Sequence, residues 1–177
     1  DGAAPAPGRR ARARTPQKAS KNKASENAHS TTQGEAMLAV GHAAYARKDW
    51  PAAMTAFQRS AEAGSAEGAW ELSLMHAHGK TGVVDKEEAR KWLKIAAEGG
   101  AVKAQMFLAQ MSTFGRGGYE KDESVAFEYL TRAADQGNAH ATHQLGVRYL
   151  YAVGVEQDLD KAICLLYTSP SPRDGLL

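Results

Sequence analysis

The sequence predicts an all-α fold: a right-handed superhelix, or solenoid, of about four helix-turn-helix repeats. Three observations predict it. An Asp stands four residues before a small Ala in four places, and these Asp residues are spaced 36, 37 and 36 residues apart. Three copies continue through an aromatic residue, a small pair and a terminal Gly, and a Leu follows each of those Gly residues eight positions later. Self-similarity at this period is typical of units that bury their apolar faces only by stacking on one another.

The first segment of the chain differs from the rest in charge. Residues 1–33 carry a net charge of +5, whereas the remainder carries −3. Small and polar residues fill the segment and no periodic apolar face is present, which predicts a disordered basic stretch. Three interpretations stay open: a linker to a preceding domain, which we favour, the remainder of a targeting peptide, or an arm attracted to nucleic acid or an acidic membrane surface. Because the chain begins with Asp1, we expect an N-terminal part to precede it.

The repeat domain covers residues 34–166, and its units are expected at 36–64, 65–100, 101–137 and, incomplete, 138–166. In the second helix of a unit the repeated Asp is the predicted N-cap, and Glu88 stands where a capping box with Asp85 needs it. The terminal Gly suits a left-handed helix end. The framework positions that follow from the repeat are Asp85, Ala89, Trp92, Gly100, Leu108, Asp122, Gly137, Leu145, Gly146 and Asp158.

Small residues follow the repeated Leu of each first helix. They are Ser73, Ala109 and Gly146, with Gly41 at the equivalent place in the first unit. Small side chains at a helix crossing let two helix axes approach closely. We therefore expect these residues to make the stacked helices compact.

The stretch 145–166, LGVRYLYAVGVEQDLDKAICLL, resembles the Sel-1-like repeat, whose pattern is roughly L-G-x-x-Y-x-x-G-x-G-V-x-x-D-x-x-K-A-x-x-W/L followed by A-A-x-x-G. The matching residues are Leu145, Gly146, Tyr149, Gly154, Val155, Asp158, Lys161 and Ala162, while Trp92, Ala96, Ala97 and Gly100 supply the end of the motif. The resemblance covers about residues 36–166. Departures are Ser73 and Ala109 in place of the motif Gly, and His76 and Ser112 in place of the Tyr.

The first unit has a short turn at residues 48–51 and resembles a tetratricopeptide unit instead. An ordinary tetratricopeptide array is therefore the alternative at the level of the fold. The resemblance to Sel-1-like repeats implies an adaptor or scaffold that assembles other proteins. It also leaves a second class open, because some bacterial members are described as β-lactamase-like hydrolases.

Residues 167–177 depart from the repeat. Pro170 falls where the aligned copies carry Ala97 and Ala134 in mid-helix, so the helix cannot continue through it. We expect this tail to be adapter-like sequence that cuts the array inside its last helix. The apolar residues Ile163, Leu165 and Leu166 would then lack a stacking partner.

The single cysteine, Cys164, allows no internal disulfide, whereas some extracellular relatives of the repeat carry Cys pairs in each unit. This favours a reducing compartment such as the cytoplasm. No apolar run reaches the roughly 18 residues of a membrane span.

Residue types that often carry chemistry are better explained here by structure. Gly79-Lys80-Thr81 lacks the preceding Gly and strand of a phosphate-binding loop, and it is expected, like residues 115–118, to link the helices of a unit. The pairs His76/His78 and His140/His143 have no complementary ligand, and the serines fall in helical frames without a nucleophile motif. We therefore expect no enzyme activity, no metal and no cofactor.

A partner-binding surface is instead predicted where first-helix positions change from unit to unit, because fixed positions hold the fold. One row is Trp70, Met106 and His143, the next is Glu67, Lys103 and His140, and the third is Leu74, Gln110 and Val147. First helices usually line the concave face of such stacks, where a peptide can lie. Trp70 is either an exposed anchor or packed between units, and both interpretations stay open.

Overall fold

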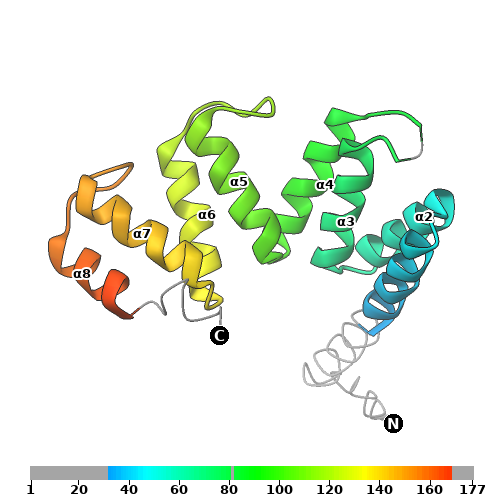
Figure 1. Cartoon of the computed structure of the whole chain (residues 1–177), viewed down its shortest axis with the longest axis horizontal. Helices are drawn as coiled ribbons and strands as arrows, with labels where there is room; N and C mark the ends of the chain where they lie inside the picture. Colours follow the sequence, from blue (N-terminus) through cyan, green and yellow to red (C-terminus); the bar gives the residue numbers. More distant parts are fainter. Residues whose placement is uncertain (1–31, 81, 169–177) are drawn as a thin grey trace, which may run out of the picture.

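The structure is a computed structural model that describes residues 32–80 and 82–168, and all regular elements in these ranges are helices. Figure 1 shows antiparallel helix pairs that stand side by side in a curved row. A helix over residues 32–46 comes first. It is followed by α2 (Trp50–Glu62), α3 (Ala66–Ala77), α4 (Lys86–Glu98), α5 (Val102–Phe114), α6 (Glu123–Asp135), α7 (Ala139–Tyr151) and α8 (Leu159–Thr168). The prediction of an all-α repeat solenoid is confirmed.

Aspartates begin the second helices, as predicted. Asp85 Oδ1 accepts hydrogen bonds from the N–H groups of Glu87 and Glu88 at 3.1 and 3.0 Å. The predicted capping box is wrong, however. The Asp85 N–H donates to the carbonyl of His76 at 3.1 Å, and the Glu88 carboxylate pairs with Lys91 instead. Because the end of α3 already satisfies that N–H, Glu88 has no donor to reach back to.

The glycines that end the second helices adopt the left-handed conformation that the sequence predicted. Their φ angles are +90° at Gly64, +99° at Gly100 and +82° at Gly137. At Gly64 and Gly137 a Cβ atom would meet nothing within 4 Å. The backbone angle, and not crowding, therefore requires glycine there.

Small residues lie at close helix crossings. A Cβ atom at Gly41 would come within 2.5 Å of Phe57 Cδ1, and one at Gly146 would come within 2.8 Å of Leu166 Cγ. Gly68 of α3 similarly faces the Ser60 side chain of α2. The prediction of close helix packing is confirmed at Gly41 and Gly146.

The buried apolar residues form two clusters that meet on α5. One cluster extends from Ala44 to Leu108, and the other joins Ala109 to Leu130 and Leu145. Adjacent residues of a helix point about 100° apart, so α5 presents different faces to the two clusters. This helix therefore links the N-terminal and C-terminal halves of the described array.

Buried polar side chains also join successive units. Arg148 of α7, only 6% exposed, donates to Glu123 Oε2 at 2.7 Å and to Thr113 Oγ1 at 2.6 Å. Gln105 of α5 donates to the carbonyl of Ala97 in α4 at 3.1 Å. These hydrogen bonds satisfy groups that would otherwise be costly to bury.

The two ends of the repeat domain are only partly described. The basic residues 9–23 and Pro170 lie outside the described residues, but residues 32 and 33 already belong to the first helix. That helix is held near its start, because Ser60 Oγ donates to the Gly34 carbonyl at 2.7 Å. At the other end Ile163 is exposed, as expected. Leu165 and Leu166 are half-buried because α8 packs on α7, which corrects the expectation that they lack a partner.

Candidate binding surface on the first helices

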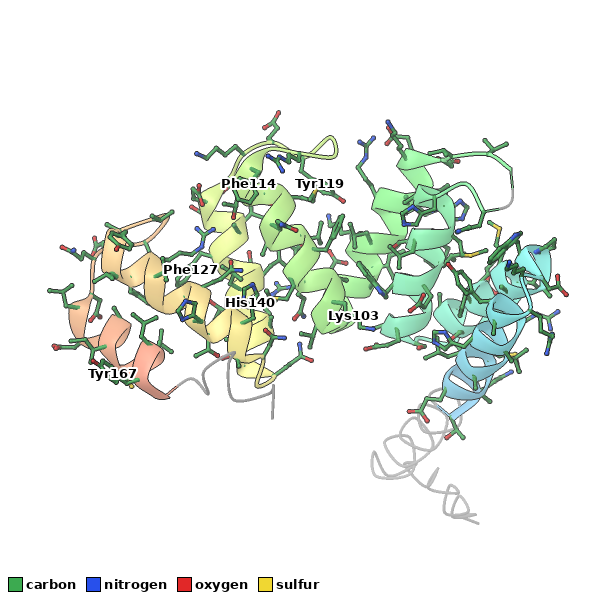
Figure 2. The ribbon with its side chains drawn as sticks, in the orientation of Figure 1. Lys103, Phe114, Tyr119, Phe127, His140 and Tyr167 are labelled. Carbon is green, nitrogen blue, oxygen red and sulfur yellow. The ribbon has the colours of Figure 1, made fainter. Side chains whose placement is uncertain are left out.

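A groove of about 640 Å³ lies between α5 and α7. Its lining is Lys103, Met106, Phe107, Gln110, Thr113 and Phe114 from α5, with His140 and Gln144 from α7. In Figure 2, Lys103 and Phe114 mark opposite ends of α5, and His140 stands on the neighbouring α7. The groove therefore follows most of the length of α5.

The groove combines an apolar surface with polar groups. Phe107 and Phe114 are 38% and 56% exposed, which is unusual for two phenylalanines on one helix. The Arg116 guanidinium lies 5.1 Å from the Phe114 ring centre, so a cation also stands at this end of the groove. On the α7 side, Gln144 and His140 are in hydrogen-bond contact at 2.7 Å.

A smaller cavity of about 230 Å³ lies beside the groove, between α3, α4 and α5. Its lining is Trp70, Ser73, Leu74 and Ala77 of α3, Lys86, Ala89, Arg90 and Leu93 of α4, Phe107 and Met111 of α5, and Gly117 and Tyr119 of the following loop. Phe107 lines both the groove and the cavity. Its ring meets that of Trp70 edge to face, with 5.9 Å between the ring centres.

Tyr119 stands in the loop after α5 (Figure 2) and lines the cavity from there. Its hydroxyl group is buried and has no hydrogen-bond partner among the described residues. Burial raises the pKa of this phenol, although the nearby Arg90 acts in the opposite direction. The hydroxyl therefore stays protonated at neutral pH and can donate a hydrogen bond. Arg90 itself pairs with Glu87 and donates to the Gly117 carbonyl.

Four of the six side chains predicted to bind a partner line one of these two sites. Lys103, Met106 and Gln110 line the groove. Trp70 lines the cavity, where it is half-buried against Phe107, as its packing interpretation required. Glu67 and His143 are exposed on α3 and α7 and line neither site.

The remaining members of the three compared rows also differ in whether they line a site. His140 lines the groove and Leu74 lines the cavity, whereas Val147 is half-buried on α7 and lines neither.

Sequence reasoning missed several residues of the two sites. Phe107 and Gln144 belong to a further changing row, with Glu71, directly before the repeated Leu, so the same comparison of units would have found them. Phe114 ends its helix and Tyr119 lies in the connection that follows, outside the first-helix rows that were compared. Neither position had a signal in the repeat pattern.

Residues considered for catalysis or metal binding have structural roles where the structure describes them. Ser60 and Ser73 donate to backbone carbonyls, at 2.7 Å each, and Ser112 is buried. Gly79, Lys80 and residues 115–118 lie in the connections within units, as predicted, while Thr81 is outside the described residues. In the ranges 32–80 and 82–168, no three His, Cys, Asp or Glu side chains gather as a metal site would. None of the helices in these ranges has the length and apolarity needed to cross a bilayer.

Stacked helical pairs of this kind define an all-α repeat solenoid, a class whose members are generally non-enzymatic scaffolds that bind other proteins. A family model described as "Sel1 repeat" matches residues 66–100, 102–138 and 139–166, which together are more than half of the chain. The chain belongs to the Sel1 repeat family. The resemblance inferred from the sequence is confirmed.

Solved structures support the same fold. A Sel1 repeat protein from Oxalobacter formigenes is 34% identical, with a TM-score of 0.60; the match covers 64% of this chain and 84% of that one. A protective antigen of uropathogenic Escherichia coli strains that displays an SLR fold is 22% identical, with a TM-score of 0.57. That match covers 86% of this chain and 40% of the antigen, and it shows the fold alone.

Proposed function

We propose that this protein is a non-catalytic adaptor whose first helices bind an extended segment of a partner protein in the groove between α5 and α7. The observation that carries the proposal is the groove itself, with exposed Phe107 and Phe114 beside Lys103 and Gln110. Exposed apolar side chains that are grouped together and bordered by polar residues are characteristic of protein-binding surfaces. Membership of a family of protein-interaction repeats supports the same proposal.

The dimensions of the groove suit a short extended peptide. Its lining on α5 runs from Lys103 to Phe114, a span of roughly 17 Å at a rise of about 1.5 Å per residue. An extended chain advances about 3.3 Å per residue, so roughly five residues fit along the helix. Their alternate side chains would face the groove, while the others would point to solvent.

The test is an unbiased selection of phage-displayed random peptides against the 177-residue chain. Recovered peptides are then titrated by fluorescence polarisation against the wild type, Phe114→Ser and Ile95→Ser. Ile95 is also exposed and apolar, at 40%, but it lies on α4 and lines neither site, which makes it the matched control. We expect Phe114→Ser to weaken binding about tenfold, the size of a moderate interface contribution, and Ile95→Ser to change it less than about twofold.

Equal effects of the two substitutions would contradict the groove proposal. The same conclusion would follow if no peptide is recovered that binds the wild type above the level of an unrelated helical protein.

A further inference from the structure

We infer that the cavity between α3, α4 and α5 is an anchor pocket that takes one large apolar side chain of a partner protein segment, flanked in that segment by acidic residues. The inference rests on the proposed function, because the anchor belongs to the segment that lies in the neighbouring groove. It adds the chemistry of the partner, which the groove alone does not define.

Continuity of the two sites is the first argument. Phe107 forms a wall of both the groove and the cavity, and Met111, one turn further along α5, also lines the cavity. A segment that follows α5 in the groove therefore passes beside the cavity. One of its side chains can enter the cavity while its backbone stays in the groove.

The lining of the cavity is suited to an apolar group. The apolar side chains of Trp70, Leu74, Leu93 and Met111 are among those that line it. A volume of about 230 Å³ exceeds that of a single water molecule several times, but these walls offer water few hydrogen-bond partners. Replacement of such water by a leucine or aromatic side chain is favourable, by roughly tenfold or more in affinity.

Charge indicates what flanks the anchor. The side chains lining the two sites that can carry a charge at neutral pH are basic, namely Lys86 and Arg90 at the cavity and Lys103 with His140 at the groove. Among the described residues, no Asp or Glu lines either site, although residues 34–177 carry a net charge of −3. Lys86 and Lys103 make no ion pair within the described chain, whereas Arg90 pairs with Glu87.

Acidic residues on both sides of the anchor would complement this arrangement. Glu67 and Glu71 lie on α3 outside both linings. Their negative charge would disfavour acidic residues of the partner at positions that reach past the cavity onto α3. Charge complementarity of this kind selects among partners and speeds their association.

Tyr119 supplies the polar contact. A buried hydroxyl without a hydrogen-bond partner is uncommon and costly, and a bound acceptor removes that cost. The Tyr119 ring is a wall of the cavity, so a small movement of this side chain on binding would bring the hydroxyl to a carbonyl or side-chain oxygen next to the anchor. The cavity thus combines apolar walls, a basic border and one orphaned donor.

The probes are labelled eleven-residue peptides with Ala, Leu, Phe or Trp at the centre and two Asp, two Ser or two Lys residues on each side. Their dissociation constants for the 177-residue chain are measured by fluorescence polarisation. We expect the Asp-flanked peptides with a large apolar centre to bind at least tenfold more tightly than the Asp-flanked Ala peptide. The Lys-flanked series should bind most weakly, and added salt should reduce these differences.

Two variants and one matched control locate the binding. Ala77→Met places a long side chain at the exposed edge of the cavity, and Ala43→Met, on the first helix and outside both linings, is its matched control. Only Ala77→Met should remove the preference for a large centre. Tyr119→Phe deletes the hydroxyl alone, and we expect about fivefold weaker binding without a lower melting temperature, because the hydroxyl has no partner in the free protein.

The inference is overturned if Leu, Phe and Trp centres bind no better than Ala, or if Ala77→Met and Ala43→Met behave alike. It is also overturned if free indole fills the cavity and no peptide competes, which would indicate a small-molecule site. If Ala77→Met is harmless while Phe114→Ser still weakens the selected phage peptides, the anchor pocket fails and the groove stands. If Phe114→Ser is harmless as well, both fail.

Discussion

Arg148 is the side chain that ties the last two described units together. It reaches from α7 to Glu123 at the start of α6 and to Thr113 near the end of α5, and almost none of it meets solvent. A buried guanidinium needs such partners, because an unpaired charge in this position would be strongly unfavourable. The three residues come from two successive family repeats, so the contact stabilises their stacking.

We expect Arg148→Ala to lower the free energy of unfolding by about 2–3 kcal/mol, since it leaves Glu123 and Thr113 without their shared donor. This loss is smaller than that expected for a fully buried ion pair, because the Glu123 side chain is 24% exposed. Urea denaturation followed by far-ultraviolet circular dichroism measures it. Arg132→Ala, which breaks an exposed pair with Glu128 within α6, should cost less than about 0.5 kcal/mol. Similar losses for the two variants would show that Arg148 does not link the units.

Sequence comparison could not predict these residue contacts. A repeat pattern shows which positions recur, and Arg148 recurs nowhere, so its partners appear only when α5, α6 and α7 are placed in space. The same limit explains Trp70. Its changing row indicated a first-helix surface, but only the edge-to-face contact with the Phe107 ring shows that it is half-buried in a cavity.

At the scale of helices, the crossing of α7 and α8 depends on the absence of a side chain at Gly146. The Leu166 side chain occupies the space that a Cβ atom would need, and the carbonyl of Ala162 lies 3.4 Å from the same point. Glycine in a helix costs roughly 1 kcal/mol relative to alanine, so close packing must offset that cost here.

Gly146→Ala should therefore destabilise the protein by about 1–2 kcal/mol, even though alanine is the better helix former. Thermal and urea unfolding of the single variants and of Gly146→Ala/Leu166→Ala form a double-mutant cycle. The two substitutions should be non-additive by about 1 kcal/mol, because removal of the Leu166 side chain relieves the clash. A stabilising Gly146→Ala substitution, or strict additivity, would argue against this close crossing.

Helices were the part of the fold that sequence could predict well. Their Asp caps, terminal glycines and repeated leucines recur in phase, and each has a local physical cause that acts in every unit. The capping box failed for a reason outside the helix, because the carbonyl of His76 in the preceding helix takes the N–H that Glu88 would have accepted. Loop residues such as Tyr119 were unpredictable, since the residue three positions before the repeated Asp changes from Gly82 to Tyr119 to Val155.

At the scale of the molecule, α5 is the central helix of the described array. The two core clusters meet on it, the groove follows its exposed side, and the cavity opens beside Phe107. The charged side chains that line both sites are basic, whereas the repeat domain as a whole is acidic. One helix thus joins the structural core to the surface proposed for the partner.

The most direct test of that surface is site-specific photo-crosslinking. A benzoylphenylalanine is introduced at Gln110, exposed in the groove, or at Lys94, exposed on α4 and outside both linings, and each protein is irradiated with a peptide from the phage selection. The adaptor account predicts a crosslink to the peptide from position 110, abolished by excess unlabelled peptide, and none from position 94. Crosslinking from position 94 alone would place the partner on the second helices and contradict the account.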